Sequence, residues 1–218
     1  MLLLGIDTCG PSGSVALGRL ASDGVAILDQ TELAGRTYSA TLVAAIQGLL
    51  KAGGAVLGDI GCIVVVHGPG SFTGVRVGLS AGKGLAEGAG IALVAVSRLR
   101  VLAGKAGVEA AALDAHRSEL FLRIGESEPR ELLAGAEDLA RLAPASEIAV
   151  CDDPAEALLG EVWPSALRVR VAPPTAADAL LIAAPAIVAG QFADAVLLDG
   201  NYLRRSDAEI FGNSVGKS

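Results

Sequence analysis

IGCIVVVHGPGSFTGVRVGLSAGKGLAEGAGIALVAV, residues 60–96, is the stretch that decides the fold. An apolar run, β-branched from Ile63 onward, leads into a glycine-rich turn, a helical stretch to about Glu87, and a second apolar run at Ile91–Val96. Two short apolar runs around a helix are typical of a βαβ unit, whose parallel strands are buried on both faces. The stretch therefore predicts an α/β fold with helices covering a sheet.

The residues before this unit predict three strands and a helix. Leu2–Ile6, Ser14–Leu20 and Ala26–Leu33 are separated by short Gly-, Pro- and Asp-containing turns, which favours an antiparallel meander. Apolar residues then recur at helical spacing from Leu42 through Ile46 to Leu50. The first hundred residues thus predict the order β-β-β-α-β-α-β, which is that of a ribonuclease-H-like layer.

The second half partly repeats this order in a weaker pattern. We expect strands and short helices between about residues 110 and 159, and a helix that opens with the capping box Thr175–Asp178 and kinks or ends at Pro185. The chain is accordingly divided into an N-terminal subdomain, 1–103, a smaller C-terminal subdomain, 104–205, and a polar tail, 206–218. A return of the chain to the first subdomain is expected near 190–205.

Composition narrows the class of protein. Hydrophobic residues make up 52% of the 218 residues and charged residues 19%, which disfavours disorder. The most apolar segment, 179–193, is shorter than the roughly 20 residues of a membrane span, and the first residues lack a signal peptide's basic region. We expect a soluble cytoplasmic protein that does not bind membranes.

Charge and cysteine content exclude two further kinds of site. A net charge of −7 disfavours RNA binding by the chain alone, because neutralisation of phosphates dominates such affinity. Cys9, Cys62 and Cys151 are far apart and lack CxxC spacing, which indicates buried thiols in place of a disulfide or zinc site.

The glycines of residues 68–84 raise the question of phosphate binding. Gly78–Gly84 is one residue short of the P-loop pattern, and the dinucleotide pattern fails because its third glycine falls at Gly74 in place of residue 73. An anion on the backbone amides of residues 71–73, at a helix N-terminus, stays open.

The alternative is that the glycines allow close packing. On a helix, Gly74, Gly78 and Gly82 lie roughly opposite a polar stripe that runs from Arg76 to Glu87. Each helical glycine costs about 1 kcal/mol relative to alanine, so a surface is expected to approach that face closely. Either the protein's own sheet or another subunit fits this requirement, and we favour a subunit interface. Its candidate residues are Gly70, Phe72, Thr73, Gly74, Val75, Gly78, Gly82, Leu42 and Ile46.

Four motifs together resemble the TsaB family, the dimerisation subunits of the bacterial tRNA threonylcarbamoyladenosine machinery, once described as glycoprotease-like. The motifs are LGIDT at 4–8, GPGSFTGVR at 68–76, LDAHRSE at 113–119 and NYLRRSD at 201–207, with Ser97 as a further match. The resemblance covers most of the chain, and GPGSFTGVR is its most specific part. It implies two ribonuclease-H-like subdomains of the actin/Hsp70/sugar-kinase superfamily, the second one reduced.

The resemblance also implies partners. It predicts a cytosolic subunit that pairs with the catalytic paralogue TsaD, with the ATPase TsaE joining, to modify the adenosine next to the anticodon. In isolation the subunit would pair with a second copy of itself, and tRNA would be reached only through the complex. No cofactor of its own is implied, although ATP or ADP would bind at the complex with partners.

The resemblance assigns no catalytic residue and no metal ligand to this chain. The paralogue's His-x-x-x-His pair is absent, because the only histidines are His67 and His116, and Tyr38 stands where many relatives carry a histidine. Relatives that bind ATP place a magnesium-organising Asp at the end of the first strand, so Asp7, with Thr8, Gly10 and Ser12, is a candidate vestigial phosphate loop.

Three functional hypotheses follow. We favour a non-catalytic partner subunit of the tRNA-modifying complex. The first alternative is an ATP-dependent transferase or ATPase in its own right; against it, Asp7 is more typical of an aspartate whose carboxylate accepts from turn amides. A weaker alternative is a peptidase built from Ser71, His116 and Asp7, although nothing around Ser71 matches a nucleophile elbow.

Overall fold

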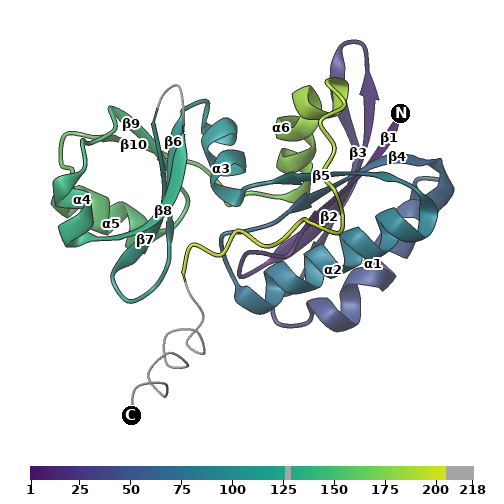
Figure 1. The fold of residues 1–218 in the computed structure, drawn as a ribbon, viewed down its shortest axis with the longest axis horizontal. Coiled ribbons are helices and arrows are strands. Elements are labelled where there is room, and N and C mark those ends of the chain that lie inside the picture. Colours follow the sequence, from purple (N-terminus) through teal and green to yellow (C-terminus); the bar gives the residue numbers. More distant parts are fainter. Residues whose placement is uncertain (126–128, 205–218) are drawn as a thin grey trace.

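The computed structural model describes residues 1–125 and 129–204 and consists of two lobes (Figure 1). The first lobe is a five-stranded sheet in the order β3-β2-β1-β4-β5. Strands β1 to β3 form the antiparallel meander, and β4 and β5 add to β1 in parallel. The strands are β1 (Leu2–Asp7), β2 (Gly13–Ala21), β3 (Gly24–Leu33), β4 (Ile60–Val66) and β5 (Ala92–Val96).

Helices cover both faces of the first sheet. On one face lie α1 (Tyr38–Ala52) and α2 (Phe72–Ala89), with the short 3-10 turn η1 (Leu57–Asp59) leading into β4, and on the other lies α6 (Ala176–Val188) (Figure 1). Helix α2 begins where the Ser71 side chain accepts a hydrogen bond from the Gly74 amide at 3.3 Å, and it ends at Gly90 in the left-handed conformation. The sequence prediction for this lobe is confirmed.

The second lobe repeats the strand order of the first. Its sheet runs β10-β9-β6-β7-β8, again with three antiparallel strands and two parallel additions. The strands are β6 (Ala110–Asp114), β7 (Glu119–Ile124), β8 (Arg130–Gly135), β9 (Glu147–Val150) and β10 (Leu167–Arg170), and the helices are α3 (Arg98–Ala106), α4 (Ala136–Arg141) and α5 (Asp153–Val162). The predicted pair of ribonuclease-H-like subdomains is confirmed.

The chain returns to the first lobe earlier than predicted. Helix α6 packs on the first sheet from Ala176 onward, where the Ala176 amide donates to Ser14 Oγ at 2.8 Å. The segment near 190–205 also lies on this lobe, since the Ala193 amide donates to the Leu93 carbonyl at 2.8 Å and the Asn201 amide to the His67 carbonyl at 2.7 Å. Leu180 is fully buried there, because an almost wholly apolar helix is needed to cover the sheet's second face. The helix also continues past Pro185 to Val188, and the tail 206–218 lies outside the described residues.

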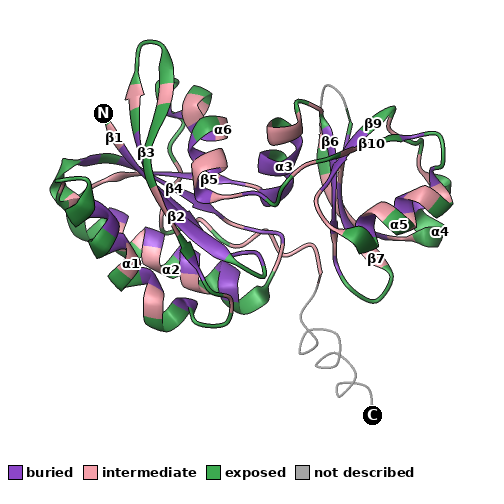
Figure 2. Cartoon of the chain, turned by 180° about the vertical axis from the view of Figure 1, so that it is seen from behind, coloured by how far each residue is buried: buried purple, intermediate pink, exposed green. Residues whose placement is uncertain are grey.

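The glycine face of α2 packs against the protein's own sheet. A side chain at Gly74 would collide with the Thr8 carbonyl oxygen, and one at Gly78 with Thr8 Oγ1. Thr8 Oγ1 donates to the Gly74 carbonyl at 2.7 Å, which joins the helix directly to the end of β1. These glycines and Gly82 are buried within the chain (Figure 2). The placement of these three glycines on a subunit interface is therefore corrected.

Three other predicted interface residues are also buried within the chain. Val75, Leu42 and Ile46 belong to the core of the first lobe and present no surface to a partner. A bulky residue at Gly78 would accordingly disturb the fold itself, because it would separate α2 from β1.

We expect Gly74→Ala to lower the free energy of unfolding by about 1–3 kcal/mol or more, because the added methyl group would overlap a backbone oxygen that cannot rotate away. Gly84→Ala is the matched control on the same helix: Gly84 faces open space, so this variant should gain about 1 kcal/mol from helix propensity. Urea denaturation followed by circular dichroism measures both. Equal stabilities for the two variants would contradict the close approach.

Candidate functional site in the cleft between the lobes

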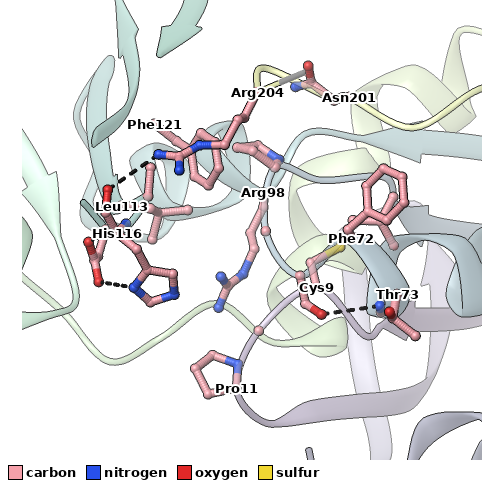
Figure 3. Close-up of a pocket in the computed structure, with 18 of the residues that line it drawn as sticks. Cys9, Pro11, Phe72, Thr73, Arg98, Leu113, His116, Phe121, Asn201 and Arg204 are labelled. Atoms are coloured by element: carbon pink, nitrogen blue, oxygen red, sulfur yellow. Dashed lines mark hydrogen bonds and ion pairs between the residues drawn. The ribbon is translucent and has the colours of Figure 1, made fainter. Parts of the chain in front are cut away.

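A cleft of about 1230 Å³ lies where the two lobes face each other (Figure 3). Its walls are the turns that follow β1, β4, β6 and β9, the first residue of α3, and the segment 201–204. These turns all follow the carboxyl ends of strands, which is where ligands bind in open α/β sheets. The cleft is therefore the candidate functional site.

The turn after β1 holds its aspartate beneath the surface. Asp7 is buried, and its Oδ1 accepts a hydrogen bond from the Cys9 amide at 2.8 Å. Burial raises the pKa of Asp7, and the neighbouring Arg98 guanidinium opposes that shift. Thr8 is also buried, Gly10 lines the cleft and Ser12 is exposed. The Asp7 carboxylate thus accepts a hydrogen bond from a turn amide. This is the alternative to a phosphate loop that the sequence left open.

Groups of the chain itself fill the inner side of this turn. The Tyr38 hydroxyl donates to the Gly10 carbonyl at 2.9 Å, and the Ser71 amide donates to the Cys9 carbonyl at 2.8 Å. Arg98 lies against Gly10, where an added Cβ would stand 2.6 Å from its Nη2. Burial raises the pKa of Tyr38 to about 12, so the phenol stays protonated and remains a donor. Tyr38 therefore holds the turn after β1 through its hydroxyl group.

The opposite wall is a strained turn between β6 and β7. His116, Arg117 and Ser118 all have positive φ, at 61°, 57° and 58°. Such a conformation costs about 1–2 kcal/mol per non-glycine residue. Asp114 holds it: Oδ1 accepts from the His116 amide at 2.7 Å, and Oδ2 lies 2.9 Å from His116 Nδ1. The His116 side chain is 87% exposed and lies on the cleft wall (Figure 3).

The third wall contains the predicted interface residues that do reach the surface. Gly70, Phe72 and Thr73 line the cleft beside the N-terminus of α2. The centre of the Phe72 ring lies 5.0 Å from that of the Tyr202 ring, and the Arg76 guanidinium stacks over the Phe72 ring at 3.8 Å. This stack attaches the returning C-terminal segment to α2.

The outer face of α1 and α2 carries exposed residues that the sequence analysis missed. Val43 is 56% exposed on α1, next to other small or polar exposed side chains. The other exposed small or polar residues of these helices include Ala40, Ala44, Gln47 and Gly48 on α1 and Ser80, Gly84 and Gly88 on α2. The helical periodicity of the sequence could have predicted the exposure of Val43, because this residue lies outside the apolar stripe formed by Leu42 and Ile46.

The peptidase constellation is not assembled. Ser71 Oγ accepts from the Gly74 amide, Asp7 accepts from Cys9, and His116 pairs with Asp114. Within residues 1–125 and 129–204, no hydrogen bond joins Ser71, His116 and Asp7 to one another.

No cluster of three or more His, Cys, Asp or Glu side chains suited to a metal ion occurs in the described part of the chain. Among the helices that the structure describes, none combines the length and apolar character needed to cross a bilayer.

Comparisons with known proteins identify related sequences and folds. The family described as "TsaD: tRNA N6-adenosine threonylcarbamoyltransferase" matches residues 27–141. The tRNA threonylcarbamoyladenosine biosynthesis protein TsaB of Escherichia coli is 33% identical over 66% of this chain, and its Bacillus subtilis counterpart is 32% identical over 56%. These matches span 63% and 53% of the two relatives, so the aligned part is less than two thirds of each.

Solved structures extend the likeness to almost the whole chain. A Pseudomonas aeruginosa protein described as similar to the peptidase YeaZ shares 28% identity and a TM-score of 0.72 over 93% of this chain and 99% of its own. The P. aeruginosa YeaZ structure gives a TM-score of 0.70 at 26% identity, over 93% of this chain and 99% of that one.

We expect Asp7→Asn to raise stability at pH 7. The pKa of Asp7 is raised in the folded chain, so the folded state binds more protons than the unfolded state between the ordinary aspartate pKa and the raised value. Stability is therefore lost as pH rises through that window, and the neutral amide avoids the loss while still accepting from the Cys9 amide.

Denaturant midpoints between pH 4 and pH 7 test this expectation. The advantage of Asp7→Asn should shrink toward pH 4, where the wild-type carboxyl group is itself protonated more often. Asp29→Asn, at an exposed aspartate that also accepts from a backbone amide, should change little. A less stable Asp7→Asn variant at pH 7 would show that the Asp7 charge stabilises the fold.

Proposed function

Because the chain belongs to the family of the tRNA N6-adenosine threonylcarbamoyltransferase TsaD, we propose that it is a TsaB-type partner subunit, non-catalytic on its own. It binds a TsaD-type catalytic subunit and supports modification of the adenosine next to the anticodon. The observation that carries this proposal is the inward position of Asp7 under a turn filled by Tyr38 and Arg98. A magnesium-organising carboxylate would have to face the cleft.

The outer face of α1 and α2 is the proposed contact with TsaD. It combines an exposed apolar side chain, Val43, with small residues spaced four apart on each helix, such as Ala40 and Ala44 on α1 and Gly84 and Gly88 on α2. Small side chains let a second pair of helices approach closely, because the distance between helix axes follows side-chain size at the contact. In isolation, the same face would pair two copies of the chain about a two-fold axis.

The other partners follow from this role. TsaE would join the assembled pair, and ATP or ADP would bind at the complex with its partners. tRNA would be reached through the complex, which agrees with the net charge of −7. Such an assembly would act in the cytoplasm.

Reconstitution tests the proposed function. The chain is mixed with TsaD and TsaE of its own organism, tRNA, ATP and the threonylcarbamoyl donor system, and modified adenosine is measured by mass spectrometry. Modification should require all three proteins, and the chain alone should show no ATP turnover with magnesium. Turnover by the lone chain would favour the ATPase alternative, and full modification without the chain would exclude the partner role.

We expect Val43→Asp to weaken binding to TsaD by about tenfold or more, because it places a charge in the centre of the proposed contact. Sedimentation or calorimetry with the purified pair measures the affinity. Leu167→Asp is the matched control, an exposed leucine on β10 of the other lobe, and should bind as the wild type does. Unchanged affinity in Val43→Asp, with the fold intact, would place the contact elsewhere.

A further inference from the structure

Arg98 is a buried cation that makes no side-chain hydrogen bond to the described residues. It is the first residue of α3 and is only 7% exposed. Its Nε is buried and makes no hydrogen bond, and within residues 1–125 and 129–204 its guanidinium forms no hydrogen bond or ion pair. Arginine stays charged and carries five N–H donors, and burying such a group unpaired is costly. Its guanidinium donors therefore stay available to an acceptor from outside the described residues.

The guanidinium points into the cleft. Figure 3 shows it between His116 on one wall and Pro11, in the turn after β1, on the other. One edge lies against Gly10, whose lack of a side chain makes room for Nη2. The nearest buried carboxylate, Asp7, attracts Arg98 electrostatically but accepts its hydrogen bond from Cys9.

The charges around Arg98 favour an anion. Among the described residues the cleft is lined by four arginines, of which Arg204 is paired with Glu119, and by two aspartates, in a chain whose net charge is −7. Both aspartates are engaged: Asp114 pairs with His116, and Asp152 accepts from the amides of Asp114 at 3.1 Å and Ala155 at 2.8 Å. A cleft lined by an excess of one sign of charge concentrates counter-ions. The charged lining residues are Arg36, Arg98, Arg117, Arg204, Asp114 and Asp152.

We propose that the cleft binds the oxyanion of a small ligand, a carboxylate or a phosphate group, on the guanidinium of Arg98, with His116 facing it across the cleft. Carboxylate and phosphate both present two oxygens that match the guanidinium fork. Arg98 itself occupies the space beside Gly10, so the anion binds to a side chain and not in a cradle of turn amides. This site is independent of the proposed partner role.

The cleft offers room beyond the oxyanion. Its volume of about 1230 Å³ exceeds the roughly 300–1,000 Å³ of small-molecule sites. Leu113 and Phe121, which belong to one hydrophobic cluster, add an apolar part to the lining of this cleft (Figure 3). The ligand class is therefore a small organic acid or phosphate ester whose body fills the cleft beside its anionic group.

Anion titrations of the full-length chain test the proposal. Sodium phosphate and sodium acetate are added separately, with sodium chloride keeping the ionic strength constant, and binding is followed by calorimetry and thermal unfolding. Wild type should show saturable binding of at least one of the two anions, and the one bound identifies the phosphate or the carboxylate source. Arg98→Met should weaken that binding about tenfold or more, because it removes a charge-assisted bidentate pair.

Arg100→Met is the matched control, an exposed arginine two residues along the same helix, and should bind as wild type does. If Arg98→Met does not fold, Arg98→Lys tests the proposal. Lysine keeps the positive charge but lacks the two parallel N–H donors of the guanidinium, so this variant should still bind the anion more weakly than wild type. Absence of saturable binding by wild type overturns the proposal. Equal binding by wild type, Arg98→Lys and Arg98→Met overturns it as well, because the anion would then occupy another place.

Discussion

The contact between α2 and the end of β1 determines the geometry of the cleft. Thr8 donates its hydroxyl to the Gly74 carbonyl, and the absence of side chains at Gly74 and Gly78 lets the helix lie against the strand end. This approach buries Asp7 and brings the Ser71 amide within reach of the Cys9 carbonyl. Gly74 and Gly78, each costing about 1 kcal/mol in helix propensity, are explained by this close packing of α2 against Thr8.

That packing changes the chemistry available at the turn after β1. A phosphate loop works by pointing free backbone amides at its ligand. Here the Cys9 amide binds Asp7, the Gly10 carbonyl binds Tyr38, and the Arg98 guanidinium lies over Gly10. An anion in the cleft would accordingly bind to side chains, above all to the Arg98 guanidinium, and not to backbone amides.

The sequence predicted elements with strong local signals. The meander, the βαβ unit and the capping box at Thr175 were all identified, because periodicity and caps are encoded within a few residues. Strands β8 and β10 were missed, since they are short strands at the edges of their sheet. The docking of α6 was also missed, because its bond to Ser14 joins residues 162 positions apart.

The site shows the same limit. Helical periodicity separated the glycine face of α2 from its polar stripe, yet a pattern along one helix does not say which surface meets which face. The glycines packed inward, and Val43, which the core stripe of α1 excludes, faces outward. Arg98 gave no signal, because its unpaired state depends on where Asp7, Asp114 and Asp152 place their own hydrogen bonds.

Both lobes have an aspartate at the end of their first strand, but the turn that follows it is covered differently in each lobe. Asp7 ends β1 and Asp114 ends β6, at matching places in the repeated strand order, and each carboxylate accepts from the amide two residues on, at 2.8 Å and 2.7 Å. In the first lobe α2 closes over the turn. In the second, the Asp152 side chain accepts from the Asp114 amide at 3.1 Å, and the Asp114 side chain stays 21% exposed. The turn after β1 is covered by the backbone of α2, whereas the turn after β6 is held by the Asp152 side chain. His116 in the second turn therefore stays exposed to the cleft, opposite Arg98.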